Sequence, residues 1–119
     1  MSLADLTAAL LNFRDERNWA QFHSLRNLIV SLNLEAAELL ELIQWKNDED
    51  MASLLDEPGK LDVLSEECAD VLLYLLLIAN KAGIDLEEVA KAKLTKNAQK
   101  YPVEKSFGKS IKYTDLPKL

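Results

Sequence analysis

A run of nine consecutive apolar residues, Val71 to Ala79, restricts the fold of this chain more than any other feature. It is shorter than the roughly 20 residues that a helix needs to cross a bilayer, so it predicts no membrane span. A helix that is apolar on every side must be buried on every side. A single bundle of 119 residues offers too little surface for that. We therefore expect a homo-oligomer, either a dimer or a tetramer.

The rest of the chain also favours helices. Glycine and proline number only three each, and apolar residues recur at helical spacing. The predicted helices cover residues 3–13, about 24–46, about 61–81 and about 86–100, with a connector at 18–23 and a loop at 47–60 that has room for one short helix. We expect one all-α, four-helix-bundle-like domain over residues 1–119, in which residues 103–119 form an extended tail.

Charge and cysteine content narrow the function. The net charge is -6 and the pI is near 4.8, and a net-acidic chain repels the phosphates of nucleic acid. The single cysteine, Cys68, excludes an intrachain disulfide. The first residues do not read as a basic-then-apolar signal peptide. We expect a cytoplasmic protein that binds neither nucleic-acid polymers nor membranes.

Two pairs of carboxylates lie on two of the predicted helices. Glu35 and Glu38 are three residues apart, and so are Glu67 and Asp70, so each pair shares one helix face. If the two helices pack antiparallel, the pairs can face each other. Four carboxylates form a hard, oxygen-rich cage that suits Mg²⁺ or Mn²⁺ better than zinc. The alternative is two solvated faces, although both pairs adjoin apolar segments.

Other residues near these helices have two interpretations each. Tyr74 and Trp45 follow the acidic pairs on the same helix faces; by default they are core residues, but beside a metal site an aromatic ring can stack on a base. His23, the only histidine, fits a capping or loop position. Lys93 and Asn97 share one side of the last helix. A cationic stripe there would clamp a polyphosphate, whereas the alternative is an ordinary solvated face.

A set of sequence blocks runs in order over almost the whole chain. They are Arg17–His23, Arg26–Leu28, Glu35–Leu39 with Gln44-Trp45, Glu66–Leu75, Lys93 with Asn97, Lys100–Val103 and Lys112–Pro117. Together they resemble the MazG-like nucleotide pyrophosphohydrolases of the all-α NTP pyrophosphatase superfamily, and within it the dCTP pyrophosphatase type. Leu34 and Ala37 stand where that type usually has glycines. This difference leaves the metal ligands in place and affects the prediction of the base.

The resemblance implies an enzyme. Its members cleave the α–β phosphoanhydride of a nucleoside triphosphate, here dCTP or a modified dCTP, and release the monophosphate and pyrophosphate. Such an activity would clear modified nucleotides from the pool. The alternatives are a broad-specificity NTP pyrophosphatase without dCTP preference and a non-catalytic helical oligomerisation module. A di-iron bundle would need Glu-x-x-His motifs, and neither acidic pair has a histidine three residues on.

The resemblance also assigns roles to individual residues. The metal ligands would be Glu35, Glu38, Glu67 and Asp70, with Mg²⁺ as the cofactor and Mn²⁺ as a substitute. The substrate-binding residues would be Trp19, His23, Trp45, Tyr74, Lys93 and Asn97. A metal-activated water would attack phosphorus in line. We expect one carboxylate to orient or deprotonate that water, with Glu38 the first candidate and Glu41 the alternative.

Overall fold

The computed structural model describes residues 1–117, which contain helices and no strand. The all-α prediction is therefore confirmed. The chain divides into two compact units, Met1–Ile84 and Asp85–Leu119. The first unit contains α1 (Leu3–Glu16), the 3-10 turn η1 (Ala20–Phe22), α2 (Leu25–Ile43), α3 (Asp48–Leu54) and α4 (Pro58–Ala82). The second contains α5 (Leu86–Lys100), α6 (Val103–Ser106) and the 3-10 turn η2 (Tyr113–Asp115).

The helix ends follow local rules of capping. Ser2 starts α1 with a reciprocal capping box, because its hydroxyl accepts from the Asp5 amide at 3.1 Å and its own amide donates to Asp5 at 3.0 Å. Gly83 ends α4 with φ of 69°, a left-handed conformation that glycine adopts without steric cost. The predicted start of α4 at residue 61 is wrong. The helix begins at Pro58, because proline fits the first turn, where no amide hydrogen is needed.

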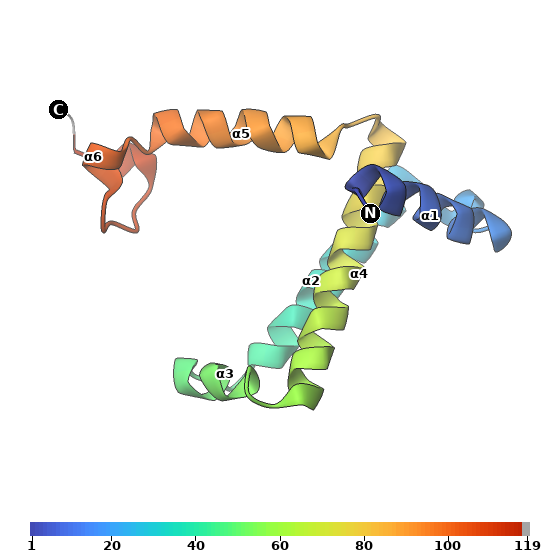
Figure 1. Cartoon of the computed structure of the whole chain (residues 1–119), viewed down its shortest axis with the longest axis horizontal. Helices are drawn as coiled ribbons and strands as arrows, with labels where there is room; N and C mark the ends of the chain where they lie inside the picture. The colour runs from blue at the N-terminus through green and yellow to red at the C-terminus, as the bar shows by residue number, and fades with distance from the viewer. Residues whose placement is uncertain (118–119) are drawn as a thin grey trace. The chain divides into compact units, whose positions relative to one another are not determined.

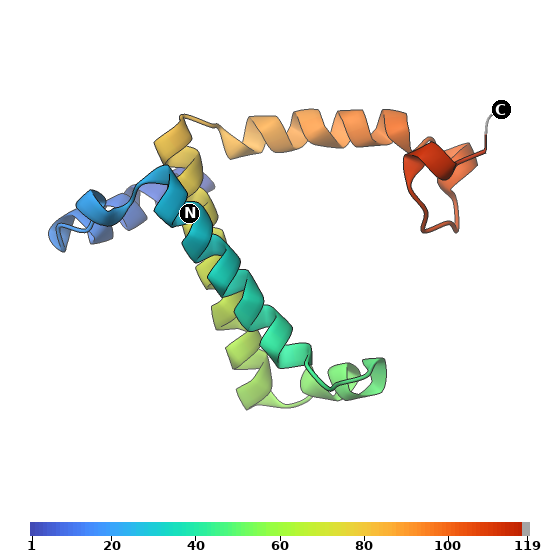
Figure 2. The same cartoon turned by 180° about the vertical axis from the view of Figure 1, so that it is seen from behind.

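The packing of α2 against α4 organises the first unit. Figures 1 and 2 show the two helices side by side and antiparallel, with α1 lying across the C-terminal half of α4. The buried apolar side chains come from α2, α3 and α4, and they are Leu28, Leu54, Leu76, Leu77 and Ala79. Three of the four predicted long helices thus pack in this unit, whereas α5 belongs to the other. The four-helix-bundle arrangement therefore stays a prediction.

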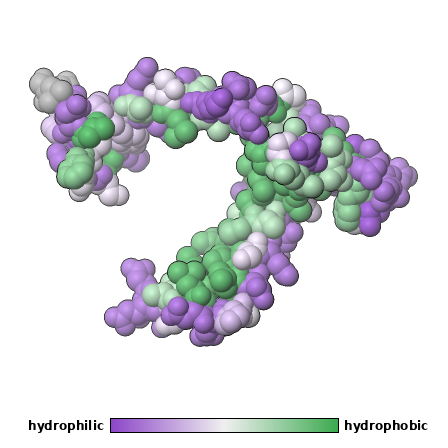
Figure 3. Space-filling model, viewed as in Figure 1, coloured by the Kyte–Doolittle hydropathy of each residue, from purple (hydrophilic) through white to green (hydrophobic). Residues whose placement is uncertain are grey.

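Many large apolar side chains of α2 and α4 remain exposed. Leu34 and Leu40 of α2 are 63% and 64% exposed, and Leu72 and Leu75 of α4 are 36% and 37% exposed. Figure 3 shows apolar surface along this helix pair. Leu72 and Leu75 belong to the nine-residue apolar run, so the first unit by itself does not cover every side of α4.

The C-terminal segment is not simply extended. It forms α6 and η2, and it folds back on the end of α5. The Tyr113 ring lies edge-on to Tyr101 at 6.2 Å, and the Lys100 ammonium lies 4.9 Å from the centre of the same ring. The predicted tail also includes residues 118–119, which lie outside the described part. Within residues 1–117, no helix is long and apolar enough to cross a membrane.

We predict that Leu76→Ala lowers the free energy of unfolding by about 2–5 kcal/mol, because it opens a cavity in the buried core of the first unit. Leu76 is 3% exposed. Leu94→Ala is a matched control, since Leu94 is 70% exposed and the same change there should stay within about 0.5 kcal/mol. Urea unfolding at one protein concentration measures both. Equal losses in the two variants would contradict this account of the core.

Candidate functional site

Three carboxylates meet where α2 packs on α4. Glu35 and Glu38 come from α2 and Glu67 comes from α4, and one oxygen of each lies within 4.8 Å of the others. Residues three apart share a helix face, and the antiparallel packing turns the two faces toward each other. The structure thus brings together three of the four predicted metal ligands; we call them the acidic cluster.

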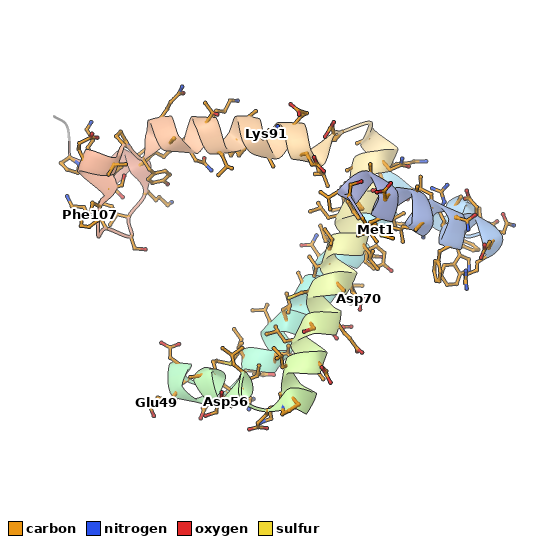
Figure 4. All side chains as sticks on the ribbon, viewed as in Figure 1. Met1, Glu49, Asp56, Asp70, Lys91 and Phe107 are labelled. Carbon is orange, nitrogen blue, oxygen red and sulfur yellow. The ribbon has the colours of Figure 1, made fainter. Side chains whose placement is uncertain are left out.

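The fourth predicted ligand, Asp70, lies one turn further along α4, at the position labelled in Figure 4. Its side chain is exposed, and it stands outside the tight group of three. Its charge nevertheless raises the pKa of both Glu35 and Glu67. Asp70 is therefore close enough to act electrostatically on the acidic cluster.

Two oxygens of the acidic cluster are buried. Oε2 of Glu35 and Oε2 of Glu67 are shielded from solvent, and neither has a hydrogen-bond partner among the described residues. Burying a polar atom without a partner costs free energy, and the cost is larger for a charged group. Carboxylate oxygens are the ligands that Mg²⁺ and Ca²⁺ prefer. The donor set and its two unsatisfied oxygens therefore fit a hard divalent cation.

The electrostatics of the cluster lead to the same conclusion. The adjacent Glu38 carboxyl raises the pKa of Glu67 to about 7, since two carboxyl groups can share a hydrogen bond only if one is protonated; burial and the charges of Glu38, Glu35 and Asp70 add to this effect. Burial, followed by the charges of Glu38 and Asp70, raises the pKa of Glu35. Without a cation, the cluster therefore holds a proton near neutral pH.

A cavity of about 220 Å³ has Asp70 in its wall, one turn along α4 from Glu67 of the acidic cluster. Its lining residues come from α1, the connector and α4, and they are Leu10, Phe13, Arg14, Trp19, His23, Asp70, Leu73, Tyr74 and Leu77. Asp70 therefore belongs to the cavity wall and also acts on the cluster. Three predicted substrate-binding residues, Trp19, His23 and Tyr74, meet in this cavity.

The connector positions two of these residues. The Trp19 amide donates to the Arg14 carbonyl at 3.1 Å, and the turn passes through Asn18 in a left-handed conformation with φ of 54°. The Trp19 ring packs edge-on against Phe13, with centroids 5.7 Å apart. His23 carries a buried Nδ1 with no hydrogen-bond partner in residues 1–117. Burial, followed by the charge of Arg14, lowers the pKa of this imidazole.

Sequence reasoning did not single out Leu10, Phe13 and Arg14 as pocket residues. All three lie on α1, at positions three and four apart that share one face. That spacing was the only available signal, and it did not show against which helix the face would pack.

Other predicted residues lie elsewhere. Trp45 follows the end of α2, is 93% exposed and does not line the cavity. Glu41 is exposed and outside the acidic cluster. Lys93 and Asn97 lie on α5 in the second unit, so their contact with phosphate or sugar stays a prediction.

Several known proteins are similar to this chain in sequence and in fold. The MazG-like family model matches residues 30–116. The protein called dCTP pyrophosphatase 1 from Rattus norvegicus is 41% identical over 117 residues, which are 98% of this chain and 69% of that one. Its Homo sapiens counterpart is 38% identical over 116 residues, 98% of this chain and 68% of that one.

A solved structure gives the same result. A pyrophosphatase from Archaeoglobus fulgidus DSM 4304 superposes with a TM-score of 0.74 and 42% identity, over 83% of this chain and 91% of that one. The matches extend through both helices that carry the acidic cluster. By sequence and by fold, the chain belongs to the MazG-like family.

Proposed function

We propose that this protein hydrolyses a nucleoside triphosphate, dCTP or a modified dCTP, to the monophosphate and pyrophosphate. The observation that carries the proposal is the acidic cluster, with its two buried and unpartnered oxygens, beside an aromatic-lined cavity. The relatives named dCTP pyrophosphatase 1 support cytosine as the base. Removal of modified nucleotides from the pool would be its role in the cell.

The predicted metal ligands fit a divalent cation, with Mg²⁺ as the proposed ion and Mn²⁺ as a substitute. Glu35, Glu38 and Glu67 would hold it, and Asp70 would complete the set from one turn along α4. When bound, the ion supplies neutralising charge for the phosphates and lowers the pKa of a bound water. The carboxylates would decide where the ion is held, and so where the phosphates bind relative to the cavity.

The cavity would hold the base. Pockets for drug-sized ligands measure about 300–1,000 Å³, so a cavity of about 220 Å³ suits a single ring better than a whole nucleotide. Trp19 and Tyr74 offer flat rings for stacking. Because Asp70 lines the cavity wall and lies next to the cluster, a base in the cavity would direct its phosphates toward the carboxylates.

Glu38 is the stronger of the two candidates for orienting or deprotonating the attacking water. Glu38 belongs to the acidic cluster, and its side chain is exposed to solvent. Glu41, one turn further along α2, lies outside the cluster. A general base must be within hydrogen-bond reach of the proton that it accepts, and a residue of the acidic cluster would be closer to a metal-bound water than one outside it.

A second copy of the chain would complete the protein as a dimer or tetramer. The exposed apolar residues on α2 and α4, among them Leu34, Leu40, Leu72 and Leu75, form a surface that a copy could cover. Trp45 is 93% exposed with φ of 67°, a strained conformation for a bulky residue. We propose that it contributes to the base site of a neighbouring copy, since it does not reach the cavity of its own chain.

We predict that the protein with Mg²⁺ converts dCTP to dCMP and pyrophosphate faster than it converts the other canonical dNTPs. Chelation should abolish the reaction, and Mn²⁺ should restore it. Chromatography of the nucleotides and a pyrophosphate assay measure both products. Release of inorganic phosphate alone, or no consumption of any triphosphate with Mg²⁺ present, would overturn the proposed reaction. Equal rates on all dNTPs would instead favour a broad-specificity enzyme.

We predict that Glu38→Gln lowers kcat at least about 100-fold, as loss of a general base does. Without divalent cation its melting temperature should be no lower than that of the wild type, because the change removes one of the charges that repel in the acidic cluster. Glu41→Gln tests the competing assignment, and Glu49→Gln, an exposed acid of α3, is the matched control. A Glu38→Gln enzyme that kept more than about a tenth of wild-type activity would count against the assignment.

We predict that sedimentation at micromolar concentration gives a dimer or a tetramer. We also predict that Trp45→Ala lowers activity and that co-expression of this variant with inactive Glu38→Gln restores part of it. Mixed oligomers would contain one site with an intact Glu38 and a neighbour's intact Trp45. A sedimentation result that shows only a monomer would contradict the proposed oligomer. Co-expressed chains no more active than the two variants measured separately would show that Trp45 does not act across copies.

A further inference from the structure

Three polar, ionisable side chains other than Tyr74 line the cavity: Arg14, His23 and Asp70. Asp70 belongs with the metal ligands, and His23 already appears among the predicted substrate-binding residues. Arg14 has no role in the proposed function. Its side chain is only 22% exposed, and within the described residues its charged partner is the adjacent Asp15.

Arg14 is held in place by its neighbour. Its Nε donates to Oδ1 of Asp15 at 2.8 Å, and its Nη2 lies 2.8 Å from the same oxygen. A guanidinium has five N–H donors and no acceptor. No other side-chain hydrogen bond engages Arg14 within residues 1–117. The anchored group therefore keeps free donors beside the cavity.

We infer that Arg14 is a specificity-determining residue that selects cytosine over thymine and uracil by donating hydrogen bonds to N3 and O2 of the base. The inference rests on the proposed function. Cytosine presents N3 and O2 as adjacent acceptors, and thymine and uracil carry a hydrogen on N3. Two parallel N–H groups fit two adjacent acceptors, as in the arginine–guanine pairs of DNA recognition. In thymine and uracil N3 carries a hydrogen, so an N–H group of Arg14 would face another donor and could not form a hydrogen bond with it.

His23 complements this pattern. His23 lines the same cavity, and its Nδ1 is buried and has no hydrogen-bond partner among the described residues. Burial and the nearby charge of Arg14 lower its pKa, so the imidazole is neutral at pH 7 and offers one acceptor nitrogen. The amino group on C4 of cytosine is a donor, whereas thymine and uracil carry an acceptor oxygen there. The two side chains thus present donors and an acceptor that match cytosine and mismatch thymine and uracil.

The test compares kcat/KM for dCTP, dTTP and dUTP with saturating Mg²⁺ in the wild type and two variants. Arg14→Ala removes the donors and should lower the ratio of dCTP to dTTP activity at least about 10-fold, because an unmatched polar group discriminates strongly. Arg14→Gln offers both a donor and an acceptor, so it should lower dCTP activity and raise dTTP activity. Lys60→Ala, which removes an exposed cation of α4, should leave the ratio unchanged.

Melting temperatures close to that of the wild type would show that the variants are folded. If Arg14→Ala does not fold, Arg14→Gln alone tests the inference. A ratio within about threefold of the wild type would overturn the inference, given that such pairs are worth at least a factor of about 10. Equal losses on all three nucleotides would also overturn it, since they would place Arg14 on the phosphates or sugar. Failure of the wild type to cleave any triphosphate would instead overturn the proposed function.

Discussion

The structure depends on a conflict at the interface of α2 and α4. Apolar packing through residues such as Leu28, Leu76 and Leu77 draws the helices together, and the same contact forces Glu35, Glu38 and Glu67 within 4.8 Å. Like charges at that distance repel, and burial adds to the cost. The raised pKa of Glu67, about 7, expresses this cost. The protein keeps an unfavourable arrangement that a bound cation would relieve.

The position of α1 gives the cluster its second component. By lying across α4, α1 places Phe13 and Arg14 opposite Tyr74, and the connector then turns Trp19 and His23 into the same cavity. Asp70 lies at the junction of the cavity and the acidic cluster. One helix, α4, therefore contributes both to the acidic cluster, through Glu67, and to the cavity wall, through Asp70 and Tyr74.

Apolar side chains of α2 and α4 remain exposed close to the acidic cluster. A lone antiparallel helix pair with α1 on one side leaves Leu34, Leu40 and Leu72 in contact with water. The strained and exposed Trp45 lies at the end of the same pair. Part of this exposed surface, including Leu72, belongs to the nine-residue apolar run, and all of it lies on the two helices that carry the acidic cluster.

Much of the local structure follows from sequence alone, because caps and breakers act over a few residues. Ser2 and Asp85 cap the starts of α1 and α5 with their side chains, and Gly83 ends α4, close to the boundaries that the sequence predicts. The start of α4 at Pro58 is not predicted, because a proline can end one segment or occupy the first turn of the next helix. The two short helical segments after Pro102 were also missed, since α6 and η2 are too short to show a period.

The sequence by itself determined that the chain is helical and that two acidic pairs lie on separate helices, because helical spacing fixes which residues share a face. Only the tertiary structure decided that Glu35, Glu38 and Glu67 meet, that Asp70 joins them to a cavity, and that Arg14 lines it with His23. It also separated Trp45 from that cavity within one chain. The reason is physical: a periodic pattern specifies a face, but only long-range packing specifies what that face meets.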